Sequence, residues 1–327
     1  MTKLAVVGAT GLVGTKILET IERKGIHFDE LVLFSSKRSA GQEVTFKDQT
    51  YTVQELTERA TDGQFDYVLM SAGGGTSKQF APLFEQHGAI VIDNSSQWRM
   101  TDNVDLVVPE VNAPTFQRGI IANPNCSTIQ SVVPLKPLQD TFGLKRVAYT
   151  TYQAVSGSGM QGKKDLEDGA HGAQPKAYPH PIYNNVLPHI DVFLDNDYTK
   201  EEQKMIDETR KILNLPDLKV TATCVRVPVQ DSHSVHINVS LEKPASVESI
   251  RALFEKDNRV VLVDDPKSNA YPLAIHSTGK DEVFVGRIRQ DDSLENTFHI
   301  WCTSDNLLKG AALNAVQVLE QVLALRA

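Results

Sequence analysis

Cys126 stands where an apolar, strand-like run gives way to a helical one. The apolar run at 119–122 precedes Asn125 and Cys126, and a helical pattern follows over 129–138. The N-terminal end of a helix stabilises a thiolate and lowers the pKa of the thiol. The same amides, together with Asn125, can hold the oxyanion of a tetrahedral intermediate. These residue types in this order predict a nucleophilic cysteine that forms a thioester.

The other cysteines provide a contrast. Cys224 and Cys302 lie inside alternating strand patterns, where a buried structural thiol is the usual role. A sparse set of three cysteines without CxxC spacing fits neither a disulfide framework nor a zinc site. We therefore expect no metal and a reducing, cytoplasmic location.

His233 is the best candidate for the base that a thiol nucleophile needs. It follows a strand that contains Cys224 and Arg226, then a turn, and it opens a second strand. Arg226 would then lie on an adjacent strand segment, where it could pair a carboxylate bidentately. On spacing alone, a structural histidine is the simpler interpretation of His233.

A glycine loop near the N-terminus predicts a dinucleotide site. It has the G-x-x-G-x-x-G spacing and lies between a strand at 3–8 and an amphipathic helix. Such glycines let the backbone approach a pyrophosphate, and the helix N-terminus favours its charge. The loop residues that we expect to bind cofactor are Gly8, Thr10, Gly11, Leu12, Val13 and Gly14.

The end of the second predicted strand indicates which dinucleotide is bound. An NAD site usually carries Asp or Glu here for the ribose 2′-hydroxyl. The chain instead reads Phe34-Ser-Ser-Lys-Arg-Ser39, without a carboxylate. Ser36, Arg38 and Ser39 suit a 2′-phosphate, so we expect NADP(H).

Composition excludes several other classes of protein. The 327 residues are 41% hydrophobic and 23% charged, a normal globular balance. A net charge of −8 argues against a nucleic-acid surface. The sequence has no apolar run near the ~20 residues of a membrane span, and strand-like residues begin at Lys3, so we expect no signal peptide.

Two patterns of strands predict an α/β protein. Short, continuously apolar runs separated by helical segments indicate a parallel, Rossmann-like sheet; they lie at 3–8, 31–34, 67–70, 89–92, 106–108 and 120–122. Longer alternating runs indicate a mostly antiparallel mixed sheet in an α+β domain; they lie at 147–153, 221–227, 234–240, 282–288 and 297–302. Helices expected at 199–213 and 246–256 could cover that sheet.

Residues 158–198 lack periodicity, which is typical of functional or interfacial segments. Residues 307–325 predict a strongly amphipathic helix.

The chain resembles aspartate-β-semialdehyde dehydrogenase of the bacterial type, because it carries matching motifs along its whole length in the expected order. They are Gly8–Gly14, Ser36–Gly41, Asp93–Met100, Asn123–Thr128, Tyr152–Gly157, Lys200–Lys204, Cys224–Pro228 with His233, and Ser304–Gly310.

The resemblance implies a role for each matched residue. Cys126 would be the acyl-thioester nucleophile, His233 the acid and base, and Gln153 an orienting group. Arg226 would hold the substrate α-carboxylate and Glu201 its amino group. The residues implied for the phosphate are Arg99, Asn125 and Lys204, and those for the nicotinamide side are Ser156, Gly157 and Asn306.

The resemblance also implies an activity and an organisation. NADPH would reduce L-aspartyl-4-phosphate to L-aspartate 4-semialdehyde, with phosphate as co-substrate of the reverse reaction, in lysine, threonine, methionine and diaminopimelate biosynthesis. Residues 1–127 with helix 306–327 would form the NADP-binding domain. Residues 128–305 would bind substrate, carry out catalysis and form a homodimer.

Two local features bear on the substrate site. Ser232 stands before His233, where many relatives carry glycine, which leaves the geometry of that turn open. Glu201 and Glu202 are adjacent, so either could bind the amino group; Glu201 shares a helix face with Lys204 and is preferred.

Two other readings remain open. One is a related thioester-forming dehydrogenase, such as N-acetyl-γ-glutamyl-phosphate reductase or a glyceraldehyde-phosphate type of enzyme. The other is a non-catalytic NADP-binding sensor. Arg226 with Glu201 favours a free amino acid over an acylated one, and the pair Cys126 and His233 argues against a sensor.

Overall fold

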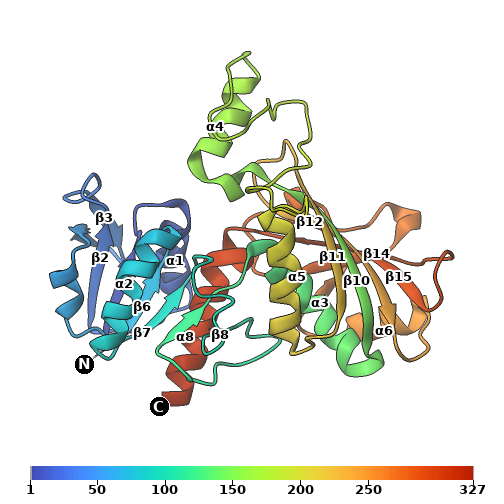
Figure 1. The fold of residues 1–327 in the computed structure, drawn as a ribbon, viewed down its shortest axis with the longest axis horizontal. Coiled ribbons are helices and arrows are strands. Elements are labelled where there is room, and N and C mark those ends of the chain that lie inside the picture. Colours follow the sequence, from blue (N-terminus) through green and yellow to red (C-terminus); the bar gives the residue numbers. More distant parts are fainter. Residues whose placement is uncertain (1, 327) are drawn as a thin grey trace. The chain divides into compact units, whose positions relative to one another are not determined.

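The computed structural model describes residues 2–326, which form two compact units. Residues 2–125 and 311–326 make the first unit, and residues 126–310 make the second. Each unit has its own sheet, so each is described by itself (Figure 1).

The first unit contains a seven-stranded sheet with the order β5-β2-β1-β6-β7-β9-β8. Its strands are β1 (Lys3–Val7), β2 (Glu30–Ser35), β5 (Gln54–Glu55), β6 (Tyr67–Met70), β7 (Ile90–Asp93), β8 (Asp105–Leu106) and β9 (Ile120–Ala122). All neighbours pair in parallel. Val6, Leu69 and Val91 are fully buried, as expected for strands covered on both faces. The predicted parallel sheet is therefore confirmed.

Three long helices accompany this sheet: α1 (Leu12–Arg23), α2 (Gly74–Gln86) and α8 (Leu313–Arg326). Helix α1 packs beside α8, and α2 packs against β6 and β7 (Figure 1). Smaller elements are the hairpin of β3 (Glu43–Phe46) and β4 (Gln49–Thr52) and the 3-10 turn η1 (Glu58–Asp62). Helix α2 and the hairpin were not predicted; α2 contains three glycine or proline residues, Gly74, Gly75 and Pro82, which weaken its helical signal.

The last helix corrects one prediction. We expected a strongly amphipathic helix over 307–325. Instead a π-helical turn, η4 (Leu308–Ala312), precedes α8, and Ala311 is partly exposed. Most of the first three turns of α8 are buried on all sides, including the polar Asn314. Asn314 Nδ2 donates to Asn123 Oδ1 at 2.7 Å and to the Val107 carbonyl at 2.9 Å, which explains its burial.

The second unit contains a six-stranded sheet with the order β11-β10-β12-β15-β14-β13. Its strands are β10 (Leu144–Gln153), β11 (Lys219–Arg226), β12 (His233–Leu241), β13 (Val261–Leu262), β14 (Phe284–Gln290) and β15 (Thr297–Ser304). The pairs β10–β11 and β13–β14 are parallel, and the other three are antiparallel. The predicted mixed sheet is confirmed, but the expected adjacency of the strands bearing Arg226 and His233 is wrong. Strand β10 lies between them, because β11 pairs with it in parallel.

One face of this sheet is covered by α3 (Cys126–Phe142), α5 (Lys200–Leu213) and α6 (Val247–Lys256) (Figure 1). Val235, Ile237 and Val239 are completely buried along β12, as expected for every second residue of a strand covered on that side. The opposite face carries partly exposed aromatic groups. There Tyr152 lies 5.3 Å from Trp301 between ring centroids.

Residues 155–199 hold more structure than the sequence indicated. A 3-10 turn, η2 (Val155–Ser158), leads into α4 (Gly159–Gly169) (Figure 1). The rest is mostly loop, which returns to the sheet where Leu187 forms a bridge with Arg226 of β11. Asp165 accepts hydrogen bonds from the amides of Lys176 and Ala177, at 2.8 and 2.6 Å, which fixes the loop against α4. Short elements elsewhere are η3 (Pro266–Ser268) and α7 (Ala274–Ser277).

Two glycines of the first loop are required by close packing. Gly8 has φ +80°, and a Cβ there would lie 2.2 Å from the Ser71 carbonyl oxygen. A Cβ at Gly14 would lie 2.1 Å from the Gly8 oxygen. Gly11 is less restricted, because its nearest such contact would be 3.4 Å. The loop after β1 thus packs directly on the loop after β6.

We expect Gly8→Ala to lower the free energy of unfolding by roughly 3 kcal/mol, from left-handed strain plus the clash. Urea unfolding measures this. Gly75→Ala is the matched control, because that helical glycine faces open space and alanine there should be neutral or stabilising. Equal stability of the two variants would contradict the packing argument.

Candidate active site and cofactor site

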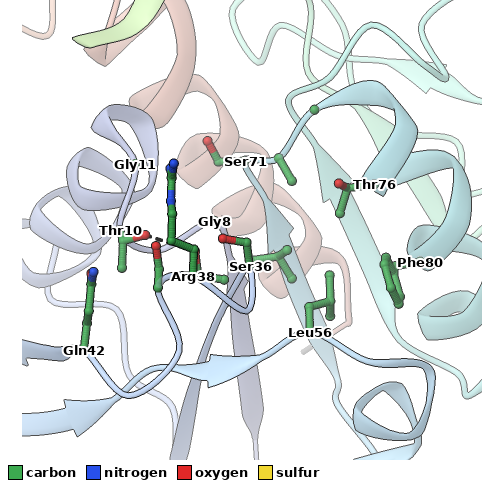
Figure 2. Close-up of a pocket in the computed structure, with 15 residues that line it drawn as sticks. Gly8, Thr10, Gly11, Ser36, Arg38, Gln42, Leu56, Ser71, Thr76 and Phe80 are labelled. Atoms are coloured by element: carbon green, nitrogen blue, oxygen red, sulfur yellow. Dashed lines mark hydrogen bonds between the residues drawn. The ribbon is translucent and has the colours of Figure 1, made fainter. Parts of the chain in front are cut away.

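A cavity of about 610 Å³ lies at the carboxyl ends of β1, β2 and β6. Strands β2 and β6 lie on opposite sides of β1, so the strand order reverses at β1. This is the topological switch point of the sheet, where open α/β sheets bind ligands. In Figure 2, Thr10, Arg38 and Gln42 lie on one side of the cavity, and Thr76 and Phe80 lie on the other.

Six predicted cofactor residues line this cavity: Gly8, Thr10, Gly11, Ser36, Arg38 and Ser39. Leu12, Val13 and Gly14 do not line it. They open helix α1, where Val13 packs against the apolar core and Gly14 packs on Gly8.

The sequence analysis missed the other half of the cavity. Ser71, Ala72, Gly73 and Thr76 come from the loop after β6 and the first turn of α2, while Leu56 and Phe80 add apolar surface. A signal was present, since the strand at 67–70 is soon followed by three successive glycines, Gly73 to Gly75, at which helix α2 begins. This repeats the strand, glycine and helix order of the first loop.

The cavity wall carries positive charge where an adenosine ribose would be recognised. Arg38 stands between Ser36 and Ser39, and the residues that line the cavity include no Asp or Glu. This donor set fits a 2′-phosphate better than a free 2′-hydroxyl, which an acidic residue would bind.

In the second unit, Cys126 is the first residue of α3, as predicted. It is partly exposed, whereas Cys224 and Cys302 are completely buried. Burial raises the pKa of both buried thiols. Cys126 Sγ lies 3.3 Å from His233 Nε2, within hydrogen-bonding distance for sulfur. The structure therefore brings together the predicted nucleophile and base, which are 107 residues apart.

The protonation of His233 follows from its second nitrogen. The backbone N–H of Ala154 donates to Nδ1 at 3.0 Å, so Nδ1 is an acceptor. The neutral ring must then carry its proton on Nε2, directed at Cys126 Sγ. Burial and, secondarily, the charge of Arg226 hold the pKa of His233 well below its usual value. The ring is accordingly neutral at pH 7 and presents an N–H donor to the sulfur.

The turn before His233 is held by predicted cofactor residues. Ser232 has φ +71°, a left-handed value that glycine adopts without strain. Its N–H donates to Asn306 Oδ1 at 2.9 Å, and Asn306 Nδ2 donates to Ser156 Oγ at 3.0 Å. Ser156 and Asn306 are thus hydrogen-bonded to each other, and Asn306 holds the backbone of the residue that precedes His233.

The predicted amino-group ligand is joined to two other predicted residues. Gln153 Nε2 donates to Glu201 Oε1 at 3.2 Å, and Lys204 Nζ lies 3.2 Å from Glu201 Oε2. Burial opposes the charge of Lys204, but Glu201 and Asp191 outweigh it and raise its pKa. Asp191, which the sequence analysis missed, lies 2.7 Å from Lys204 Nζ.

Glu202 has a structural task instead. It forms a capping box with Thr199 at the start of α5, accepting the Thr199 N–H at 2.7 Å. Its other oxygen accepts the N–H of Cys224 at 3.0 Å. Both oxygens of Glu202 are therefore engaged with backbone, whereas those of Glu201 contact the side chains of Gln153 and Lys204.

Arg226 and His233 converge on Gly157. A Cβ at Gly157 would lie 2.8 Å from Arg226 Nη1 and 3.4 Å from His233 Nε2. Arg226 is buried, and its Nη1 donates to the Ala154 carbonyl at 2.7 Å. The residue predicted to bind a carboxylate and the predicted acid–base ring thus both lie within contact distance of the side chain that Gly157 lacks.

Two predicted phosphate ligands belong to the first unit. Arg99 is buried and donates from Nε to the Asn123 carbonyl and from Nη2 to the Asn94 carbonyl, both at 2.9 Å. These carbonyls follow the ends of β9 and β7. Asn125 is also buried and immediately precedes Cys126.

Neither a membrane span nor a metal cluster is found in the part of the chain that the structure describes. No helix within residues 2–326 is long and apolar enough to cross a bilayer. Over the same residues, no group of three or more His, Cys, Asp or Glu side chains could hold a metal ion.

Gly310 packs directly against Cys126. A Cβ at Gly310 would lie 2.9 Å from Cys126 Cβ and 3.3 Å from its Cα. Gly310→Ala should therefore displace the thiol and lower turnover about a hundredfold, because small misplacements of reacting groups cost this much. Steady-state kinetics of the variant and the wild type measure the loss. Unchanged turnover in Gly310→Ala would show that the thiol position is not set by this contact.

Comparison with known proteins places the chain. Residues 3–118 match the NAD binding domain of semialdehyde dehydrogenase, and residues 135–309 match the semialdehyde dehydrogenase dimerisation domain. Aspartate-semialdehyde dehydrogenase of Aquifex aeolicus is 49% identical over 329 residues, 97% of each chain.

Solved structures agree. Aspartate semialdehyde dehydrogenase II from Vibrio cholerae, complexed with ASA, superposes with a TM-score of 0.95 at 40% identity, over 99% of this chain and 98% of that one. The Candida albicans enzyme with NADP gives a TM-score of 0.79 at 26% identity, over 99% of both chains. Since these likenesses span nearly the whole chain, the protein belongs to the aspartate-semialdehyde dehydrogenase family.

Proposed function

We propose that the protein reduces L-aspartyl-4-phosphate to L-aspartate 4-semialdehyde, consuming NADPH and releasing phosphate. The contact that carries the proposal is that of Cys126 Sγ with His233 Nε2 at the first residue of α3. A partly exposed thiol beside an imidazole at a helix N-terminus is suited to acyl transfer.

The residues account for each bond that changes. The Cys126 thiolate attacks the acyl carbon, the C–S bond forms, and phosphate leaves with the electrons of the broken C–O bond. NADPH, when bound, supplies the hydride that reduces the thioester. The neutral His233 keeps its proton on Nε2 and directs that N–H as a hydrogen-bond donor at the resulting oxyanion, whose electrons re-form the C=O bond as the C–S bond breaks. This breakage releases the aldehyde and restores the thiolate.

The α-carboxylate and the amino group of the substrate would each face a side chain of opposite charge. Arg226 binds the α-carboxylate and Glu201 binds the amino group, with Gln153 orienting the acyl end. Because Arg226 and His233 share Gly157 as a neighbour, the carboxylate site lies close to the reacting groups. This favours a short substrate, and an N-acetylated one would have no ammonium for Glu201.

The phosphate is assigned to Arg99, Asn125 and Lys204. The support for Lys204 is its raised pKa, which keeps it charged at neutral pH beside Glu201. Inorganic phosphate would occupy the same site in the reverse, oxidative direction.

We assign NADP(H) to the cavity of the first unit. Arg38, Ser36 and Ser39 would hold the 2′-phosphate, and the two glycine loops the pyrophosphate. Ser156, Gly157 and Asn306 would border the nicotinamide, whereas Leu12, Val13 and Gly14 would act through the backbone of α1.

A cytoplasmic homodimer in the biosynthesis of lysine, threonine, methionine and diaminopimelate completes the proposal. Residues 1–127 and 306–327 would serve the cofactor, and residues 128–305 the substrate. The match of 135–309 to a dimerisation domain supports the dimer. The uncovered sheet face that bears Tyr152 and Trp301 is a surface that a second copy could cover.

The proposed reaction is tested in reverse with aspartate semialdehyde, phosphate and NADP, by following NADPH absorbance. Cys126→Ala should abolish turnover and still bind NADP, because the cofactor cavity lies in the other unit. Turnover with N-acetylglutamate semialdehyde alone would overturn the substrate, and no turnover with any aldehyde would favour an NADP sensor.

Arg38→Glu should weaken NADP relative to NAD by about ten- to a hundredfold in kcat/KM, the value of one charged hydrogen bond. Lys37→Glu is the matched control, since it makes the same charge change at a neighbour that does not line the cavity. An unchanged cofactor ratio in Arg38→Glu would move the 2′-phosphate site elsewhere.

A further inference from the structure

Gln130 is a long polar side chain in the buried part of α3. It lies on α3 and is completely buried, as are its neighbours Ile129 and Val133. Its Oε1 has no hydrogen-bond partner within the described residues. A buried amide oxygen without a partner costs about 1–3 kcal/mol. Packing alone would favour an apolar residue here, so the amide needs another explanation.

The other end of the amide explains its presence. Gln130 Nε2 donates to the backbone carbonyl of His233 at 3.2 Å. That carbonyl can only accept, which fixes the orientation of the amide. Cys126 and Gln130 are four residues apart and therefore lie on the same face of α3. One helix face thus contacts His233 twice, through the thiol at Nε2 and through Gln130 at the carbonyl.

These contacts act on a residue at the end of a strand, which pairs with Ser304 of β15 and is thereby held within the sheet. Ser232, just before it, holds a left-handed backbone, and β12 begins at His233 itself. The Ala154 N–H sets the rotation of the ring through Nδ1. The hydrogen bond from Gln130 ties the start of β12 to α3, the helix that carries the thiol.

We propose that Gln130 is a positioning residue that holds His233 at hydrogen-bonding distance from Cys126. The proposal rests on the proposed role of Cys126 as nucleophile. Without the Gln130 amide, the first residue of β12 relaxes away from α3, and fewer molecules keep Nε2–H directed at the sulfur. The thiolate then loses its donor, and the oxyanion loses its nearest proton.

The test compares Gln130→Met with Gln139→Met in the full chain. Methionine keeps the length of the side chain and removes the donor. Gln139 lies on the same helix, and its Oε1 accepts the Leu144 N–H at 2.7 Å, so that change also removes one bond to backbone, away from His233.

The first readout is alkylation of Cys126 by iodoacetamide from about pH 5 to about pH 9, a range that spans the usual thiol titration. Mass spectrometry distinguishes Cys126 from the two buried cysteines. Gln130→Met should move the midpoint of the rate to higher pH and lower kcat/KM about ten- to a hundredfold. NADP affinity and the Gln139→Met profile should stay as in the wild type.

An unshifted alkylation midpoint in Gln130→Met would overturn the proposal, and so would an equal shift in Gln139→Met, which would indicate general loosening of α3. The alkylation readout needs no substrate. If wild-type protein failed to oxidise aspartate semialdehyde, the proposed function would fall, while this comparison would still decide the role of Gln130.

Discussion

The hydrogen bond from the Ala154 N–H to His233 Nδ1 constrains most of the second unit. A backbone amide cannot reverse its polarity, so the ring can carry its proton only on the nitrogen that faces Cys126. This requires Ala154, at the end of β10, to lie beside the first residue of β12. Strand β10 must therefore pair with β12, which it does with Tyr152 opposite Ser234. The tautomer of one ring thus depends on the order of the central strands.

The same order brings the substrate ligands to one place. Because β10 also pairs in parallel with β11, Gln153 and Arg226 end their strands side by side. Arg226 then reaches the Ala154 carbonyl while His233 takes the Ala154 amide. The peptide segment after β10 therefore contacts both Arg226, the proposed ligand of the substrate carboxylate, and His233, the proposed acid–base group. Its neighbour Gly157 leaves the space that they share.

Sequence patterns predicted those features that depend on residues close together in the chain. Continuous apolar runs such as 67–70 identified parallel strands, and the polar flanks of Cys126 identified a helix start. Helical spacing also favoured Glu201, whereas the capping role of Glu202 needed the structure. The insertion of β10 between β11 and β12 could not be predicted, because strand alternation does not encode pairing partners. Gln130 and Asp191 were missed for the same reason: each acts through residues distant in sequence.

Burying the polar groups of this site costs free energy, and this cost explains why each group needs fixed hydrogen-bond partners. His233 and Arg226 are buried, and Ser232 adopts a backbone that costs roughly 1–2 kcal/mol. Buried polar groups persist when fixed partners replace water. Here the partners are backbone amides and carbonyls, whose positions are set by the six-stranded sheet and by α3. A preorganised donor needs no rearrangement when charge develops during the reaction. The stability of the apolar sheet core is thus what allows a neutral histidine to stand ready beside the sulfur.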